Sequence, residues 1–316
     1  MSIALPTFDD VTRPVRTRLA DTLRDRVAGD ETTDRDARAA AIWLAEGERW
    51  FTPQDPIWRV HDDAAMFVGG LRALLLQTLH PLAMAGVAGH SGYKSDPWGR
   101  LQRTGEYIAA TTFGTVEVAQ DAIDRVRTIH QRVRGRAADG RPYAASDPHL
   151  LGWVHAAEVD SFLASHQAHG RGPLTPGEAD QYVAQSARSA TALGVLDAPR
   201  SVAELEGVLA EYRSELVASP QAHETARFLL LQPPVSGISR LGYGVLAAGA
   251  LALLPVWAKA MLRLPALPVT DRLVTRHVAG LGVDTIRWAL TDPRRPHPQA
   301  GRPAPSAVPD PPRLVV

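Results

Sequence analysis

Apolar residues recur at intervals of three and four over most of the chain, which is the spacing of amphipathic α-helices. The run 64–79 is mostly apolar and stops before Pro81, as expected of a buried helix. No segment alternates apolar and polar residues long enough to predict a convincing strand. Further helices are expected over 35–50, 97–113, 115–134, 148–166, 177–193, 202–217, 221–231, 239–263 and 269–291. We therefore predict an all-α protein.

Capping residues place several helix starts. Asp96-Pro97 combines an N-cap with proline at the first helical position, and Thr115 can cap the next helix. Two segments have capping-box spacing, Thr175-x-x-Glu178 and Ser201-x-x-Glu204. These signals favour a single large helical domain over 34–292. Prolines interrupt a partly helical N-terminal arm over 1–33, and the proline- and arginine-rich tail over 293–316 is expected to be disordered.

Composition narrows the range of functions. The chain has 316 residues, of which 45% are hydrophobic, so it can bury a large core. Lysine plus arginine and aspartate plus glutamate both number 34, so no nucleic-acid partner is predicted. The absence of cysteine excludes disulfides, thiolate catalysis and iron–sulfur clusters. The first residues lack the pattern of a secretion signal, and a cytoplasmic location is the expectation.

The segment 241–258 is uncharged and close to the minimum length of a membrane span. It contains three glycines and Pro255, and Lys259 follows it directly. A buried or peripheral helix is the simpler interpretation, and a peripheral membrane contact through 241–258 is the alternative.

One histidine falls on the apolar stripe of its helix. Ala119, Ile123, Val126 and His130 follow one another at helical spacing, so His130 is predicted to face inward. A core histidine bonded to a backbone carbonyl would explain this position. A neutral imidazole on a rigid helix is also a common protein ligand of haem iron.

The preceding helix carries polar groups on one face. Arg100, Thr104, Tyr107 and Thr111 share that face, and Arg103 lies at its edge. A buried arginine needs a partner. A carboxylate side chain would be the structural partner; haem propionates, a bound oxygen species or a substrate carbonyl would be functional partners.

Other histidines offer weaker signals. His155 lies on an apolar stripe with Leu151, Val159 and Phe162, so it is either a rival ligand or a core residue. His80 precedes Pro81 at a helix end and is expected to interact with the C-terminal dipole of that helix rather than bind a metal. His90 is expected in an exposed loop that could close over a pocket. His166 and His169 are expected to be solvated.

The sequence lacks the motifs of several common enzyme classes. The sequence has no Glu-x-x-His pair, no His-Glu-x-x-His, no Gly-x-Ser-x-Gly and no Walker A loop. Di-iron, zinc-protease, serine-hydrolase and kinase functions are therefore disfavoured.

An ordered series of motifs resembles the MpaB/latex-clearing-protein (rubber oxygenase) family over roughly 40–290. The matching stretches are 70–81, His90-Ser91-Gly92-Tyr93, Asp96-Pro97 through Arg100-x-x-Arg103-Thr104, Phe113-Gly114-Thr115, His130-x-x-Val133-x-Gly135, and Tyr143 to Trp153-Val154-His155. The resemblance implies a globin-like helical core that binds haem b. It also implies oxidative attack by dioxygen on an apolar, unsaturated small molecule of isoprenoid or polyketide-like type.

The same resemblance assigns roles to residues. His130 matches the proximal iron ligand of the family, and Arg100, Arg103 and Thr104 match its distal polar residues; His155 and Tyr107 are further candidates for contact with the cofactor. The rubber enzymes carry lysine where this chain has Arg103. A guanidinium stays protonated and does not bind iron, so lysine-type closing of the iron site is not expected. Those enzymes are also secreted, whereas the first residues of this chain lack the pattern of a secretion signal. A polymer substrate is therefore not expected.

Two alternatives remain open from the sequence. The protein could bind haem without turnover, as a store, sensor or carrier. It could also be a cofactor-free helical member of the family with another activity.

Overall fold

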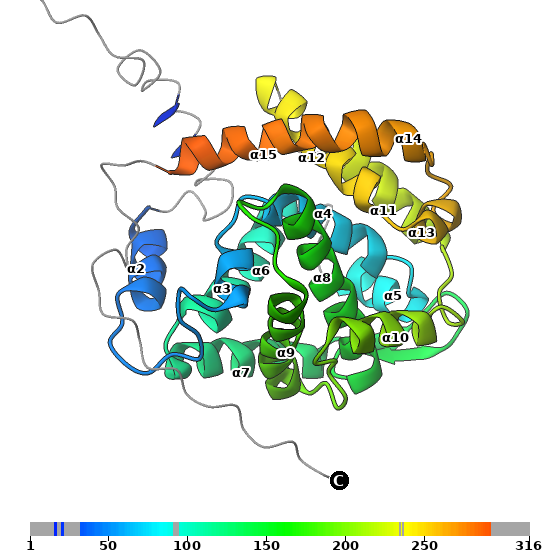
Figure 1. The fold of residues 1–316 in the computed structure, drawn as a ribbon. Coiled ribbons are helices and arrows are strands. Elements are labelled where there is room, and N and C mark those ends of the chain that lie inside the picture. Colours follow the sequence, from blue (N-terminus) through cyan, green and yellow to red (C-terminus); the bar gives the residue numbers. More distant parts are fainter. Residues whose placement is uncertain are drawn as a thin grey trace, which may run out of the picture.

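The computed structural model describes residues 16–17, 20–21, 32–90, 95–233, 235 and 237–291. Helices dominate this part of the chain (Figure 1), which confirms the all-α prediction. The more specific globin-like arrangement and the domain limits stay predictions. The tail over 293–316 lies outside the described residues, as does most of the arm over 1–33. The elements are α2 (Thr32–Trp43), α3 (Pro56–His61), α4 (Met66–Gln77), α5 (Pro81–His90), α6 (Pro97–Phe113), α7 (Val116–Arg132), β1 (Arg134–Arg136), β2 (Pro142–Ala144), α8 (Pro148–His169), α9 (Pro176–Leu193), α10 (Val202–Tyr212), α11 (Pro220–Leu231), α12 (Ile238–Leu253), α13 (Val256–Met261), α14 (Pro268–Thr270), the π-helical turn η1 (Asp271–Thr275) and α15 (Arg276–Leu290).

The long helix α8 lies at the centre of the molecule. It packs against α3, α4, α9, α10 and α15, and α11 to α15 form a layer across one end of the fold (Figure 1). Small side chains allow these close approaches: Ala156, Ala157, Ser161 and Ser165 of α8 are fully buried. Glycine plays the same part on α4, where Gly69 lies directly against the backbone of α8. Helix α8 can therefore hold functional side chains on several faces at once.

Local capping chemistry sets the helix starts as predicted. The carboxylate of Asp96 accepts a hydrogen bond from the Gly99 amide, and Thr175 and Glu178 form a complete capping box. The second predicted box is only half formed. Ser201 caps the Glu204 amide, but the Glu204 carboxylate accepts from the amide of Arg200 instead.

The chain departs from the predicted pattern where prolines and turns intervene. Helix α4 ends at Gln77, and Pro81 begins the next helix, α5. His90 is therefore the last residue of a helix and does not lie in the predicted loop. It is exposed, as expected, and its Nε2 lies 3.2 Å from the hydroxyl of Tyr143. The long helix predicted over 239–263 breaks at Leu254-Pro255 into α12 and α13. The short antiparallel pair β1–β2, which was not predicted, follows α7.

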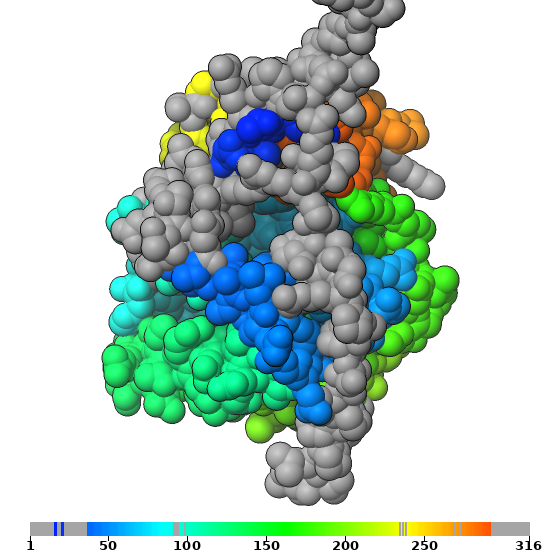
Figure 2. All heavy atoms as spheres, turned by 90° about the vertical axis from the view of Figure 1, so that its left-hand side faces the viewer, coloured from blue at the N-terminus to red at the C-terminus, as the bar shows by residue number. Residues whose placement is uncertain are grey.

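Helices α6 and α7 form an antiparallel hairpin joined at Gly114 and Thr115. Glu106 of α6 and Arg125 of α7 lie 4.0 Å apart across it. Helix α2 and the segment after it cover part of this hairpin (Figure 2), where Arg38 pairs with Glu106 at 3.7 Å and Arg49 forms a β-bridge with Thr115. The first turn of α6 and the last turn of α7 therefore lie at the same, far end of the hairpin.

The segment 241–258 spans α12 and the start of α13. Leu241 and Val256 are exposed, whereas Ala250 and Ala258 are fully buried. Among the described residues, no single helix meets the length and hydropathy expected of a membrane span, although α4 and α5 do so together across a bend of 108°.

Candidate functional site

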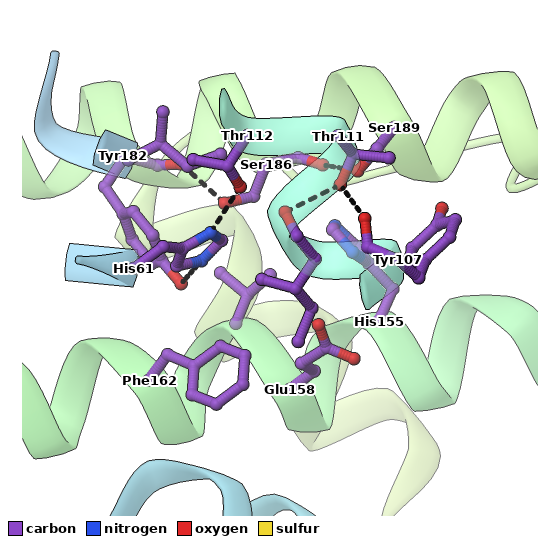
Figure 3. Close-up of a pocket in the computed structure, with 13 residues that line it drawn as sticks. His61, Tyr107, Thr111, Thr112, His155, Glu158, Phe162, Tyr182, Ser186 and Ser189 are labelled. Atoms are coloured by element: carbon purple, nitrogen blue, oxygen red, sulfur yellow. Dashed lines mark hydrogen bonds between the residues drawn. The ribbon is translucent and has the colours of Figure 1, made fainter. Parts of the chain in front are cut away.

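A small polar cavity lies between α3, α6, α8 and α9 (Figure 3). Its free volume is about 30 Å³. Its wall combines apolar side chains with two histidines, a glutamate, two tyrosines and four hydroxyl residues. The lining residues are Ile57, His61, Tyr107, Ile108, Thr111, Thr112, His155, Glu158, Val159, Phe162, Tyr182, Ser186 and Ser189.

One side of the cavity is fixed by a hydrogen-bonded chain. The Nδ1 of His61 lies 2.7 Å from the Thr112 hydroxyl, and its Nε2 lies 3.4 Å from the hydroxyl of Tyr182. Burial lowers the pKa of His61 to about 3, with a smaller contribution from His166. Because both ring nitrogens have partners and the ring stays neutral, His61 positions its neighbours and is not available as a metal ligand.

The opposite side holds groups with unused bonding capacity. Burial raises the pKa of Glu158 to about 7 and lowers that of His155 to about 4. The Nε2 of His155 is buried and has no hydrogen-bond partner in the described part of the chain. Tyr107 lines the same side, and burial raises the pKa of its hydroxyl, with Glu158 adding to the rise. A carboxyl group with a pKa near 7 can both give and take a proton at neutral pH.

The structure brings together only part of the predicted site. His155 and Tyr107 line the cavity, whereas Arg100, Arg103 and Thr104 do not. Arg103 is exposed and pairs with Asp96 at 3.2 Å. The exposed Thr104 donates its hydroxyl to the carbonyl of Arg100 at 3.0 Å. These three residues lie in the first two turns of α6, and the cavity begins one turn further along.

His130 lies at the last turn of α7, at the same end of the hairpin as Arg100. Its side chain is half-buried, and burial lowers its pKa. Its Nδ1 is buried and has no hydrogen-bond partner within the ranges that the structure describes. His130 and His155 are thus both neutral imidazoles with an unsatisfied buried nitrogen, in two separate places.

Several cavity residues were not predicted from the sequence. Glu158 lies one helical turn after His155, so the apolar stripe that contains His155 was a usable signal for it. His61 and Tyr182 belong to helices that are far apart in sequence, α3 and α9, and no local sequence pattern predicts that they meet. His166 and His169 were predicted to be solvated, which is wrong: both are buried, because α15 packs on the end of α8 and the turn that follows folds back. The Nε2 of His166 lies 3.1 Å from the Gly172 carbonyl.

A sequence model of one protein family covers most of this structure. The family described as "ER-bound oxygenase mpaB/B'/Rubber oxygenase, catalytic domain" matches residues 58–284. The chain belongs to this family. The match includes α4 to α13, the cavity residues from His61 onward, and both His130 and His155. It confirms the resemblance inferred from the motifs.

Two curated mycobacterial relatives match a shorter stretch. They are "Uncharacterized protein Rv2237" of Mycobacterium tuberculosis and "Uncharacterized protein Mb2261" of Mycobacterium bovis, each 33% identical over 99 residues. The match covers 31% of this chain and 38% of each relative's length, and neither name states an activity. No solved structure matches the chain.

His155 and His130 differ in how well their surroundings suit a haem group. The cavity beside His155 offers a neutral imidazole, but pockets for sizeable organic ligands occupy roughly 300–1,000 Å³. A free volume of about 30 Å³ therefore does not hold a porphyrin beside His155. His130 offers the same donor chemistry close to the surface. Arg100 lies at the same end of the hairpin, and β1 adds Arg134 and Arg136 directly after α7. The donor chemistry at His130, a half-buried imidazole with an unpartnered Nδ1 among the described residues, is the kind that binds haem iron.

Proposed function

We propose that this family member is a haem b-dependent oxygenase in which His130 would bind the haem iron. Family membership supports oxygenase activity. The observation that carries the haem assignment is the His130 ring, which is neutral, half-buried and left with an unpartnered Nδ1 among the described residues. Such an imidazole binds a metal ion without first losing a proton.

Arginines near His130 would hold the carboxylates of the cofactor. Arg100 lies in the first turn of α6, and Arg134 and Arg136 lie on β1 immediately after the helix that bears His130. Guanidinium groups bind carboxylates through paired, charge-assisted hydrogen bonds. The positive charge of these arginines would match the negative charge of the haem propionates.

Arg103 and Thr104 would face the oxygen-binding side. Arg103 is now paired with Asp96, but its side chain is 61% exposed. Exposed ion pairs contribute about 0–1 kcal/mol, so Arg103 can leave Asp96 at little cost. Bound haem would supply the iron centre at which dioxygen is activated. The arginine and the threonine hydroxyl would donate hydrogen bonds to the oxygen and orient the substrate.

An apolar, unsaturated small molecule is the proposed substrate. The outer layer of the fold exposes many large apolar side chains, two of them within 241–258. They support a peripheral membrane contact that includes 241–258, and a lipid-soluble substrate would reach the protein from that membrane. These side chains are Leu241, Val256, Leu267, Val269, Leu273, Val274, Val278 and Leu281.

Haem titration of three variants tests the ligand assignment. We expect the wild-type protein to bind one haem and give a Soret band, His130→Ala to lose it, and His155→Ala to keep it. His277→Ala, which removes an exposed histidine of α15, is the matched control. Loss of the band in His155→Ala alone would move the ligand to the cavity. Absence of haem binding in the wild type would support a cofactor-free protein.

Oxygen consumption tests the catalytic half of the proposal. The haem-loaded protein should consume dioxygen in the presence of an isoprenoid alkene, and Arg103→Met should slow this while leaving the Soret band in place. A haem-loaded protein that consumes no oxygen with a panel of unsaturated lipids would instead be a haem store, sensor or carrier.

A further inference from the structure

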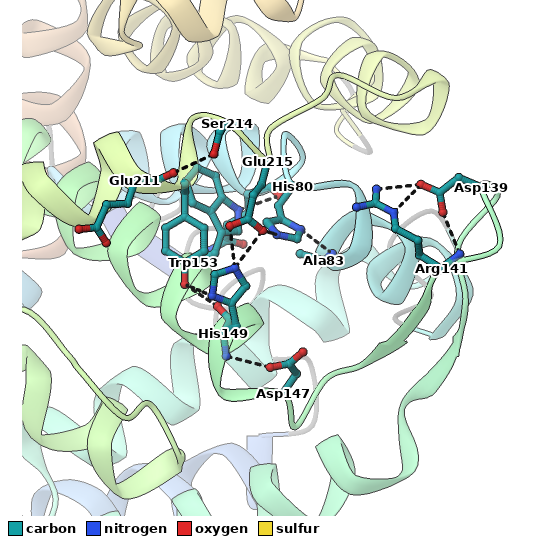
Figure 4. Close-up of polar contacts among 12 residues, drawn as sticks. His80, Ala83, Asp139, Arg141, Asp147, His149, Trp153, Glu211, Ser214 and Glu215 are labelled. Atoms are coloured by element: carbon teal, nitrogen blue, oxygen red, sulfur yellow. Dashed lines mark hydrogen bonds and ion pairs between the residues drawn. The ribbon is translucent and has the colours of Figure 1, made fainter. Parts of the chain in front are cut away.

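A second polar cluster lies away from both histidines discussed above. His80 stands between α4 and α5, His149 lies in the first turn of α8, and Glu215 follows α10 (Figure 4). One ligand atom from each side chain can be chosen so that all three lie within 4.8 Å of one another. The three residues are far apart in sequence, and the fold brings them to one point.

His80 is held with one ring nitrogen turned toward the cluster. The residue is 1% exposed, and its Nδ1 accepts the Ala83 amide hydrogen at 3.4 Å, at the N-terminus of α5 and not at the predicted C-terminal helix end. Its Nε2 is buried, makes no hydrogen bond in the described part of the chain and lies 3.6 Å from the Glu215 carboxylate. The Nε2 of His80 therefore faces the other two side chains of the cluster and makes no hydrogen bond among the described residues.

The other two donors are also oriented. The Nε2 of His149 lies 2.9 Å from the carboxylate of Glu215. The Tyr212 hydroxyl donates to the His149 carbonyl at 2.6 Å. The Tyr212 ring packs against the imidazole at a tilt of 36°, with ring centroids 4.7 Å apart. Supports of this kind orient metal ligands in known sites. The nearby positive charge of Arg141 is balanced by Asp139 at 2.8 Å.

We propose that His80, His149 and Glu215 form a binding site for a divalent transition-metal ion. Metal–ligand bonds of about 2.0–2.2 Å place neighbouring donors roughly 3–3.5 Å apart in tetrahedral or octahedral geometry. The observed separations of 2.9 and 3.6 Å to the Glu215 oxygen match that spacing. Two imidazoles and one carboxylate are a common donor set for zinc and ferrous iron.

An ordinary ion pair does not explain the whole cluster. A contact between His149 and Glu215 would account for the 2.9 Å distance at the surface. It leaves the buried Nε2 of His80 without a hydrogen bond among the described residues, which costs free energy unless another group satisfies that nitrogen. A metal ion would bond all three side chains. His149 and Glu215 are 53% and 43% exposed, so water could complete the coordination from the solvent side.

Zinc binding to the full-length, haem-free, chelator-treated protein tests the site. We expect calorimetry to give one Zn²⁺ per chain, and Co²⁺ to give the visible absorption of a low-symmetry site. His149→Ala and Glu215→Gln should each weaken Zn²⁺ binding at least tenfold. Both residues are exposed, so these variants should fold. His277→Ala should bind Zn²⁺ as the wild type does.

Thermal unfolding gives an independent readout. Zn²⁺ should raise the melting temperature of the wild type and of His277→Ala but not of His149→Ala, because the ion joins three separate segments only when all donors are present. Equal Zn²⁺ affinity in the wild type and His149→Ala would overturn the proposal. So would the absence of Zn²⁺ binding at about 100 µM, since that result means a Kd above the range from about 1 µM to about 1 mM in which a weak site would be detected. Neither result depends on whether His130 binds haem.

Discussion

Two neighbouring glycines of α4 should respond in opposite ways to the same substitution. A Cβ on Gly69 would lie 2.7 Å from the ring of Phe162 and 3.2 Å from the Ser161 carbonyl oxygen of α8. A Cβ on Gly70 would meet nothing within 4 Å. Both residues are inside the helix, so the gain in helix propensity from alanine is the same at each.

The magnitude follows from two competing effects. Alanine in place of an interior helical glycine stabilises by about 0.5–1 kcal/mol. Overpacking a close helix contact costs about 1–3 kcal/mol, and here backbone atoms block one side. Gly70→Ala should therefore raise the free energy of unfolding, Gly69→Ala should lower it, and the two variants should differ by about 1–3 kcal/mol.

Urea denaturation followed by circular dichroism measures this difference directly. For a domain of this size, 1 kcal/mol corresponds to a shift of about 2–4 °C in melting temperature, so thermal scans provide a second measure. Phe162→Leu in the Gly69→Ala background should recover part of the loss by freeing space beside the new methyl group. Equal stabilisation by both alanines would show that α4 and α8 are not in the close contact described here.

Further predictions concern charge and surface. Arg72 is buried and pairs with Asp160 at 2.7 Å, so Arg72→Met should cost about 3–5 kcal/mol in denaturation. Burial raises the pKa of Glu158 from 4.5 to about 7, which disfavours its charged form in the folded state. The free energy of unfolding of the wild type should therefore fall, relative to Glu158→Gln, as the pH rises from about 4.5 to about 7, and a constant difference across this range would contradict the assigned burial. Leu241→Ser with Val256→Ser should reduce flotation with lipid vesicles if the outer layer contacts membranes; unchanged flotation would exclude these two positions.

Features set by neighbours in sequence were predicted well. Asp96, Thr115 and Thr175 cap helices because their side chains reach amide groups two or three residues ahead, and no tertiary contact is needed. The break at Leu254-Pro255 is also set locally, by the proline, but we predicted one continuous helix through it. The small pair β1–β2 was missed because three-residue strands carry too little alternation to be recognised.

Helical spacing identifies a face but not what covers it. Arg100, Thr104 and Tyr107 share a face of α6 as predicted, yet only Tyr107 reaches the cavity, because α3 and α8 cover the later turns of that helix. The pairing of His155 with Glu158 was within reach of the sequence, since the two lie one turn apart on α8. The approach of His61 and Tyr182 depends on how α3 and α9 pack, which no local pattern contains.

Helix α8 connects the cavity, the proposed metal site and a buried ion pair. It carries His149 of the proposed metal site at one end, His155 and Glu158 of the cavity in its middle, and Asp160 beside the buried Arg72. Gly69 lets α4 approach the same helix closely. A change that separates α4 from α8 should therefore weaken Zn²⁺ binding as well as stability, because His80 follows α4 directly. Haem binding at His130, on the α6–α7 hairpin, should be affected less, and this contrast separates the two sites experimentally.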